Sequence, residues 1–190
     1  MKKESKPRLI FFGDSLTAGY KLPSEAFSFP SLIYAKLKKE GYSYEYVNAG
    51  LSGDTTSGGL ERLDWVISEG VDVFVLELGA NDSMRGIPIP LIKKNLTAII
   101  QKVRDKNPKV KILLVPMRTF PNLGPRYTQD FYKLYVEISK KENVPLSPFL
   151  LEKVAGIPSL NQSDGIHPTV KGHELLAETL YPSVQKLLAK

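Results

Sequence analysis

Short apolar runs recur along the chain and alternate with segments in which apolar residues return every three or four positions. Three of the runs are strongly apolar, which is typical of strands buried inside a parallel sheet. They cover residues 9–12, 71–78 and 110–117. Two shorter β-prone stretches, residues 44–47 and 144–149, have the composition of further strands. The pattern therefore predicts about five strands.

The segments between these runs have the periodicity of amphipathic helices. Helices are predicted over residues 30–39, 59–69, 90–106 and 127–141. A last helix follows Pro168 and carries Leu176, Leu180 and Val184 at fourfold spacing. Pro182 lies inside it and is expected to break or kink it around Tyr181, because proline cannot donate the backbone hydrogen bond.

Alternation of strands and helices within 190 residues predicts one α/β domain. We expect a three-layer α/β/α sandwich with a five-stranded parallel sheet in the flavodoxin-like order 2-1-3-4-5. The domain is expected to span residues 1–190, with residues 1–7 as a basic N-terminal tail.

Glycine-containing or polar motifs follow the predicted strands. Ser15 follows the first strand, Gly53 the second and Asn81 the third, while Asp164 and His167 come after the last. Parallel strands place all their carboxyl ends at one edge of the sheet, where open α/β sheets bind ligands. The pattern alone therefore predicts that these residues converge.

Ser15 and His167 form a candidate nucleophile and base. A serine hydroxyl is a weak nucleophile without a base. His167 follows Asp164 by three residues, a spacing that lets the carboxylate hold one ring nitrogen while the other faces Ser15. Each residue also has a structural interpretation as a helix cap or turn residue. His173, the other histidine, lies within the last helix and is predicted on its surface.

Gly53 and Asn81 are candidates for an oxyanion hole. A glycine amide approaches a ligand closely, and an asparagine side chain donates through its NH₂ group. With the Ser15 amide, this set would supply three donors. Taken singly, the two residues are also consistent with an ordinary turn glycine and an Asx turn.

These motifs together resemble the four sequence blocks of the SGNH (GDSL) hydrolase family. They are Gly-Asp-Ser-Leu around Ser15, Gly53, Gly-Ala-Asn-Asp around Asn81, and Asp164-Gly-Ile-His167, in that order along nearly the whole chain. Longer stretches resemble a bacterial branch of multifunctional acyl-CoA thioesterases, lysophospholipases and arylesterases. These stretches cover residues 13–20, 52–55, 77–82, 85–86, 126–127 and 164–168.

The resemblance implies a role for each matching residue. Ser15 would be the nucleophile, His167 the general base and acid, and Asp164 the residue that orients the histidine. The Ser15 and Gly53 amides and the Asn81 side chain would form the oxyanion hole. The implied reaction is hydrolysis of acyl esters or thioesters through an acyl-Ser15 intermediate, with neither metal nor organic cofactor. Ala80 departs from the branch, which often has glycine there, and its methyl group would narrow the crevice or shift the loop that carries Asn81.

Substrate contacts are predicted beside these motifs and in the irregular loop of residues 118–126. This loop follows a strand at the same edge of the sheet, so its apolar side chains could contact an acyl chain, although ordinary loop packing also explains them. The predicted substrate contacts are Asp14, Leu16, Ala80, Arg118, Phe120, Pro121 and Ile166.

Composition narrows the classes of partner. The chain has no cysteine, which excludes disulfides, thiolate catalysis and cysteine-based metal sites. The net charge of +6 comes from lysines that are interleaved with acids on predicted helix faces, so we expect no nucleic-acid partner. A small acyl ester or thioester is the expected substrate, with no stable membrane insertion and a monomer or weak homo-oligomer in solution.

The N-terminal residues are relevant to the cellular compartment of the protein. No apolar signal-peptide core follows residues 1–8. The chain as written is therefore expected in the cytoplasm, or in the periplasm or outside the cell if an export signal has been removed.

Two other functions fit parts of the pattern. A carbohydrate O-deacetylase would use the same three catalytic residues with a more polar crevice. A phosphoacceptor receiver or flavin-binding module would share the fold, and Asp14 suits a receiver. Such a receiver normally has a lysine after its last strand, where this chain has Ser147-Pro148-Phe149.

Overall fold

A four-stranded parallel sheet forms the centre of the protein. The computed structural model describes residues 6–119 and 121–188. The strands β1 (Arg8–Gly13), β2 (Glu45–Gly50), β3 (Val73–Glu77) and β4 (Lys111–Leu114) are arranged in the order β2-β1-β3-β4. The predicted order of the first four strands is therefore confirmed.

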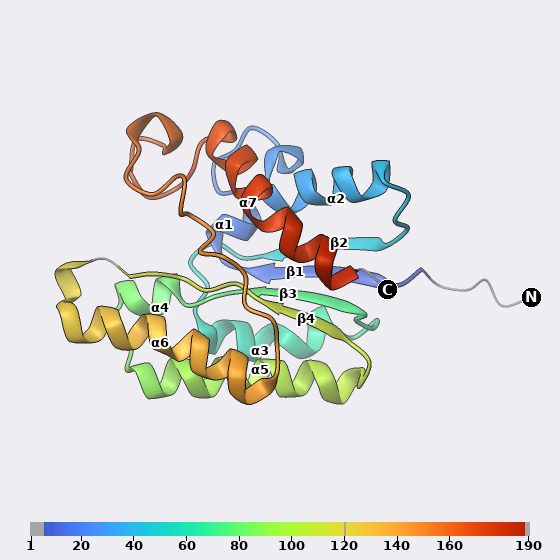
Figure 1. The fold of residues 1–190 in the computed structure, drawn as a ribbon, viewed down its shortest axis with the longest axis horizontal. Helices are drawn as coiled ribbons and strands as arrows, with labels where there is room; N and C mark the ends of the chain where they lie inside the picture. The colour runs from blue at the N-terminus through green and yellow to red at the C-terminus, as the bar shows by residue number, and fades with distance from the viewer. Residues whose placement is uncertain (1–5, 120, 189–190) are drawn as a thin grey trace, which may run out of the picture.

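Helices cover both faces of the sheet and complete the predicted three layers (Figure 1). One face carries α2 (Phe29–Lys39) and α7 (Val170–Leu188), and the other carries α3 (Thr56–Val66), α5 (Ile89–Lys106) and α6 (Pro125–Glu142). Shorter helices complete the set: α1 (Ser15–Ala18), α4 (Ala80–Met84), η1 (Glu25–Phe27), η2 (Pro121–Leu123) and η3 (Pro158–Leu160).

The predicted fifth strand is present only as an isolated parallel bridge between Leu114 and Leu146. The Leu114 amide donates to the Pro145 carbonyl, and the Ser147 amide donates to the Leu114 carbonyl, both at 3.0 Å. Pro145 has no N–H for the preceding rung of the ladder, so the pairing ends there. The segment takes the fifth position beside β4 without forming a regular strand.

Helix boundaries follow their capping residues, and the prediction misplaced several of them. α3 begins at Thr56 rather than at residue 59, because the Thr55 hydroxyl accepts a hydrogen bond from the Gly58 amide. α6 begins at Pro125, two residues before the predicted start, with proline in its first turn. η2 lies inside the predicted irregular loop of residues 118–126.

The last helix differs from its prediction in two ways. Of the break or kink predicted at Pro182, the break is absent: α7 continues through the proline, and Leu180, Tyr181 and Val184 around it are buried in the core. His173 is 1% exposed rather than on the surface. Its Nδ1 accepts a hydrogen bond from the Phe29 amide at 3.1 Å, and its ring stacks on that of Phe29. The sequence periodicity already indicated that His173 is buried, since this residue shares a helical face with Leu176 and Leu180.

The strand register brings the carboxyl ends of three strands together. Gly13 of β1 is paired with Gly50 of β2 on one side and with Glu77 of β3 on the other. A Cβ atom on Gly50 would lie 2.2 Å from the Ala18 amide nitrogen, so glycine is needed for α1 to pack against the end of β2. The segments that follow these three strands therefore begin side by side.

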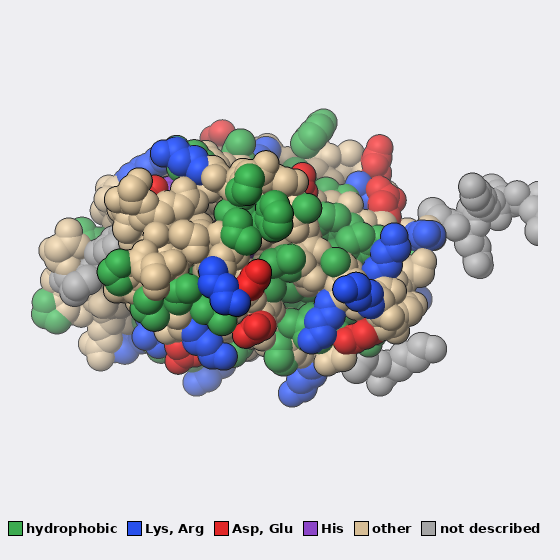
Figure 2. All heavy atoms as spheres, turned by 90° about the horizontal axis from the view of Figure 1, so that it is seen from above, with side chains coloured by type: hydrophobic (Ala, Val, Ile, Leu, Met, Phe, Trp, Pro, Cys, Tyr) green, Lys and Arg blue, Asp and Glu red, His purple; other side chains and the backbone are tan. Residues whose placement is uncertain are grey.

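Charged side chains are dispersed on the face seen in Figure 2, where Lys and Arg form separate groups with acidic and apolar side chains between them. This face therefore has no continuous positively charged patch. Within the described part of the chain, every helix is too short or too polar to cross a lipid bilayer.

A buried carboxylate joins α4 to α3. Asp82 is fully buried, and its two oxygens accept hydrogen bonds from the Thr56 amide at 2.8 Å and the Thr56 hydroxyl at 2.6 Å. Asn95 of α5 also donates to the Thr56 hydroxyl. This contact fixes the start of α3 relative to the segment that carries Asn81.

Replacing Asp82 should destabilise the protein. Asp82→Ala leaves two buried donors of Thr56 without an acceptor, which is expected to lower the free energy of unfolding by about 2–3 kcal/mol. Urea denaturation measures the change. The matched control is Asp64→Ala, which removes the exposed ion pair with Lys102 and should leave the unfolding midpoint nearly unchanged. Equal effects of the two substitutions would contradict the structural role of Asp82.

Stability should also depend on the protonation of His173. Burial lowers the pKa of this imidazole from 6.5 to about 4, so between these pH values the unfolded chain binds a proton that the folded chain does not. The free energy of unfolding is therefore expected to fall by up to about 3 kcal/mol from this group as the pH drops from 6.5 to 4.

The variant His173→Gln isolates this contribution, because glutamine offers an acceptor that does not titrate. Its unfolding free energy, measured by urea denaturation at several pH values, should fall less steeply over the same range than that of the wild type. Parallel pH profiles for the two proteins would show that His173 does not limit acid stability.

Candidate active site

The end of β1 presents Ser15 in the first turn of α1. Asp14 is the N-cap of this helix, and its Oδ1 accepts a hydrogen bond from the Leu16 amide at 3.0 Å. The cap stops the strand and starts the helix within one residue, which leaves Ser15 half-buried at the edge of the sheet. Asp14 therefore has a structural task in addition to its predicted place beside the substrate.

Ser15, His167 and Asp164 form one hydrogen-bonded chain. The Ser15 Oγ lies 3.0 Å from His167 Nε2, although the two residues are 152 positions apart. His167 Nδ1 lies 2.9 Å from Asp164 Oδ2. The ring of Tyr20 packs against the imidazole, with 4.6 Å between ring centroids. The structure thus brings together all three predicted residues in the predicted order of contact.

Asp164 is held as an ionised acceptor. Its Oδ1 accepts hydrogen bonds from the backbone amides of Ile166 at 2.9 Å and His167 at 3.0 Å. The His167 amide, the Ile166 amide and the His167 ring keep the pKa of Asp164 well below its usual range. With the carboxylate on Nδ1, the proton of a neutral imidazole is favoured on that nitrogen, and Nε2 is then left as an acceptor toward Ser15.

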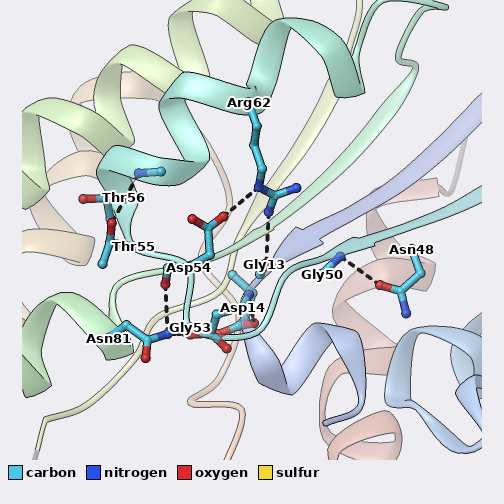
Figure 3. Close-up of polar contacts among 12 residues, drawn as sticks. Gly13, Asp14, Asn48, Gly50, Gly53, Asp54, Thr55, Thr56, Arg62 and Asn81 are labelled. Carbon is cyan, nitrogen blue, oxygen red and sulfur yellow. Dashed lines mark hydrogen bonds and ion pairs between the residues drawn. The ribbon is translucent and has the colours of Figure 1, made fainter.

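Asn81 lies at the start of α4, directly across the edge of the sheet from Asp14 and Asp54 (Figure 3). Its Nδ2 donates to the Asp54 carbonyl at 2.8 Å and to Asp14 Oδ2 at 3.3 Å. Gly79, just before α4, has φ +124, and a Cβ there would lie 2.2 Å from the Tyr135 hydroxyl. Only glycine fits this turn, which aims Asn81 at the end of β1.

Gly53 lies in the loop after β2, with φ +82. Its carbonyl accepts a hydrogen bond from Arg85 at 2.9 Å, and the next residue, Asp54, holds Asn81 through its own carbonyl. Gly53 is therefore beside Asn81 in space, as predicted, although it is not among the described residues that line the cavity at Ser15.

Two buried acids lie beneath Ser15, and the sequence reasoning missed one of them. Glu77 Oε2 accepts hydrogen bonds from the Thr17 hydroxyl at 2.7 Å and the Asp14 amide at 3.3 Å. Burial, followed by the charge of Asp14, raises the pKa of Glu77 well above its ordinary value. Burial also raises the pKa of Asp14 to about 7. The signal available in the sequence was a carboxylate that ends an otherwise apolar strand.

A cavity of about 110 Å³ opens beside the catalytic residues. Five predicted substrate contacts line it: Asp14, Leu16, Ala80, Arg118 and Ile166. Phe120 lies outside the described residues, and so does the side chain of Pro121. The sequence reasoning missed an apolar set on other segments, formed by Met84, Met117, Leu151 and Ala155. These residues come from three different segments, with Leu151 and Ala155 in the same turn, so no local motif marks them.

A larger hollow of about 580 Å³ lies at the outer edge of β4. Its lining includes Arg104 and Lys186, and none of the described catalytic candidates contributes to it. The smaller cavity is the one with reactive groups, so chemistry rather than volume identifies the site.

The geometry can support nucleophilic attack by Ser15 and, beside it, stabilisation of the negative charge that the attack creates. A hydroxyl, an imidazole and a carboxylate in series are the parts of a general-base-activated nucleophile. Amide donors at the ends of neighbouring strands can stabilise the negative charge that such an attack creates. The arrangement is that of an acyl-transfer enzyme.

Known proteins are similar in sequence over nearly the whole chain. The Esterase TesA of Pseudomonas aeruginosa is 38% identical over 181 residues, which cover 95% of this chain and 89% of that protein. The Thioesterase 1/protease 1/lysophospholipase L1 of Escherichia coli is 35% identical over 181 residues, covering 95% of this chain and 84% of that protein.

A solved structure agrees with both the fold and the sequence. The psychrotrophic esterase EstA from Pseudoalteromonas sp., solved in a form inhibited by monoethylphosphonate, superposes with a TM-score of 0.89. It is 32% identical, and the match covers 95% of this chain and 98% of EstA. The sequence model of the GDSL-like lipase/acylhydrolase family matches residues 11–175, which include Ser15, Asn81 and His167. The chain therefore belongs to the GDSL-like lipase/acylhydrolase family.

Proposed function

We propose that this GDSL-type ester hydrolase cleaves acyl esters through a covalent acyl-Ser15 intermediate. The observation that carries the proposal is the continuous chain from Ser15 Oγ to His167 Nε2, at 3.0 Å, and from His167 Nδ1 to Asp164 Oδ2, at 2.9 Å. The relatives described above are an esterase and a thioesterase/lysophospholipase, which supports acyl transfer to water as the reaction.

Acylation begins with attack of Ser15 Oγ on the carbonyl carbon of the ester. A bond forms between Oγ and that carbon, and the hydroxyl proton moves to His167 Nε2. The carbonyl oxygen becomes an oxyanion, which the Ser15 and Gly53 amides and the Asn81 side chain stabilise. Asp164 stays ionised and balances the charge of the imidazolium.

The intermediate then collapses and is hydrolysed. The carbonyl double bond re-forms as the bond to the leaving oxygen or sulfur breaks, and His167 donates its proton to the leaving group. Water then attacks the carbonyl carbon of the acyl-Ser15 ester as His167 takes one of its protons. The bond from that carbon to Ser15 Oγ breaks as His167 returns the proton to Oγ, which releases the acid and the free serine. No step in this sequence consumes a cofactor.

The lining of the cavity favours an apolar acyl group. Met84, Met117 and Leu151 contribute side chains beside Ser15, and Met117 and Leu151 come from segments that follow β4 and the bridge. Methionine and leucine offer flexible apolar contact without hydrogen-bonding groups, which fits an alkyl chain better than an acetylated sugar. The carbohydrate O-deacetylase is therefore the second candidate.

A series of p-nitrophenyl acyl esters from C2 to C12 tests the nucleophile and the acyl preference together. Wild type should hydrolyse the series, with a rate that rises from acetate to hexanoate or octanoate because the cavity wall is apolar. Ser15→Ala should fall to background, because the substitution removes the hydroxyl that forms the acyl ester. Equal activity of the two proteins would refute Ser15 as nucleophile, and a rate that is highest for acetate would favour the deacetylase.

Replacing the orienting carboxylate tests the protonation state of His167. In Asp164→Asn an amide faces Nδ1, which favours the tautomer with its proton on Nε2, so the imidazole no longer accepts the proton of Ser15. kcat should fall by about 10³- to 10⁴-fold, with little change in KM. Glu174→Gln, an exposed change in the last helix, is the control and should keep wild-type kcat. A kcat of Asp164→Asn close to wild type would remove Asp164 from the mechanism.

A further inference from the structure

Arg62 of α3 joins two of the chain segments that form the site. Its Nε donates to Asp54 Oδ2 at 2.7 Å, and its Nη2 donates to the Gly13 carbonyl at 3.2 Å. The guanidinium also lies over the ring of Phe12, with 4.1 Å between Cζ and the ring centroid. One planar group therefore ties the end of β1 to the loop after β2 (Figure 3).

Asp54 passes this connection on to Asn81. Its carboxylate is the partner of Arg62, while its backbone carbonyl accepts the hydrogen bond from Asn81 Nδ2 at 2.8 Å. Gly53 immediately precedes Asp54 in the chain. Ser15 lies two residues after Gly13, whose carbonyl is the second partner of Arg62. The Arg62 guanidinium is thus connected, by hydrogen bonds and one or two intervening residues, to all three proposed oxyanion donors.

The contact between Arg62 and Asp54 is built into the packing of α3. The side chain of Asp54 is only 5% exposed and that of Arg62 is 20% exposed. A Cβ on Gly58 would lie 2.3 Å from Asp54 Oδ1, so a glycine in the first turn of α3 leaves room for the carboxylate. Glycine is a poor helix former, and its presence here is explained by that close approach.

Arg62 acts from outside the substrate cavity. Neither Arg62 nor Asp54 is among the described residues that line the cavity at Ser15. Arg62 instead lines a separate hollow of about 420 Å³ along the outer side of β2, with Trp65 and Leu51. Both of its hydrogen bonds go to the segments that carry the proposed donors, so its effect on the reaction is indirect.

We propose that Arg62 is a positioning residue that holds the oxyanion donors in place through Asp54 and the Gly13 carbonyl. The proposal rests on the proposed function, in which the Ser15 amide, the Gly53 amide and the Asn81 side chain stabilise the oxyanion. These donors act on charge that exists only in the transition state. Loss of Arg62 should therefore lower kcat and leave KM nearly unchanged.

The primary experiment measures kcat and KM for a p-nitrophenyl ester with wild type, Arg62→Gln, Asn81→Ala and the double variant. Arg62→Gln should lower kcat by about 10- to 100-fold with KM within about threefold, since small displacements of donors are costly. In the Asn81→Ala background the same change should lower kcat by a smaller factor than in the wild type, because one of the three donors that Arg62 holds is already absent.

Conservative variants keep the experiment decisive if Arg62→Gln fails to fold. Arg62→Lys keeps the charge but has no fork to hold both acceptors, so its kcat should lie between those of wild type and Arg62→Gln. Asp54→Asn keeps the carbonyl that holds Asn81 but weakens the bond to Arg62, and kcat should again fall while KM stays nearly constant. Wild-type kcat in both variants would overturn the proposal.

The matched control is Arg104→Gln. Arg104 of α5 forms a comparable partly buried pair with Glu142 at the outer edge of β4, so its loss should lower stability without changing kcat. The proposal is wrong if Arg62→Gln keeps kcat within about twofold of wild type, or if its loss simply multiplies with that of Asn81→Ala. Full activity of Ser15→Ala would instead refute the proposed function itself, so the two failures are distinguishable.

Discussion

The in-register pairing of β1 with its two neighbours is the constraint on which the site depends. Gly13 is the last residue of β1 and lies level with Gly50 on one side and Glu77 on the other. Three segments therefore leave the sheet at the same height and begin within contact distance of one another. A shift of one residue in the pairing of β1 with β3 would turn the side chains that follow to the opposite face and separate Ser15 from Asn81.

Two kinds of residue hold this edge of the sheet together: glycines that allow close packing, and buried carboxylates that accept hydrogen bonds. Glycine permits the close approach of α1 to β2 at Gly50 and the turn before Asn81 at Gly79. Buried carboxylates then join the segments: Asp14 caps α1 and Asp82 holds the start of α3. Because burying a charge is costly, each of these acids is paired or hydrogen-bonded, and the pKa of Asp14 is raised to about 7.

The histidine side of the site comes from a different kind of contact. Residues 161–168 approach Ser15 from the far end of the chain, and the Gln162 side chain donates to the Tyr20 carbonyl and to the Pro168 carbonyl, both at 2.9 Å. Two amides and one ring nitrogen hold Asp164 in its ionised form. Hydrogen bonds within the loop, together with the one from Gln162 to the Tyr20 carbonyl, thus hold the loop in place and keep His167 within reach of Ser15.

The sequence by itself determined the sheet order of the first four strands, the three layers and the identity of the residues that converge at one edge. Apolar runs mark buried strands, and parallel strands end at a common edge, so both conclusions follow from local pattern and topology. Where the structure differs from these predictions, the reason is also physical. Pro145 removes one ladder donor and reduces the fifth strand to a bridge. His173 fits the apolar face of α7 because its neutral ring accepts the Phe29 amide.

Only the tertiary structure decided the contacts between residues far apart in the chain. The 3.0 Å contact of Ser15 with His167 and the link from Arg62 through Asp54 to Asn81 depend on how helices pack on the sheet. The same holds for the apolar cavity wall, whose side chains come from several segments. Local sequence specifies which groups are present and on which element, whereas distances of a few ångströms between elements are set by the packing of the whole core.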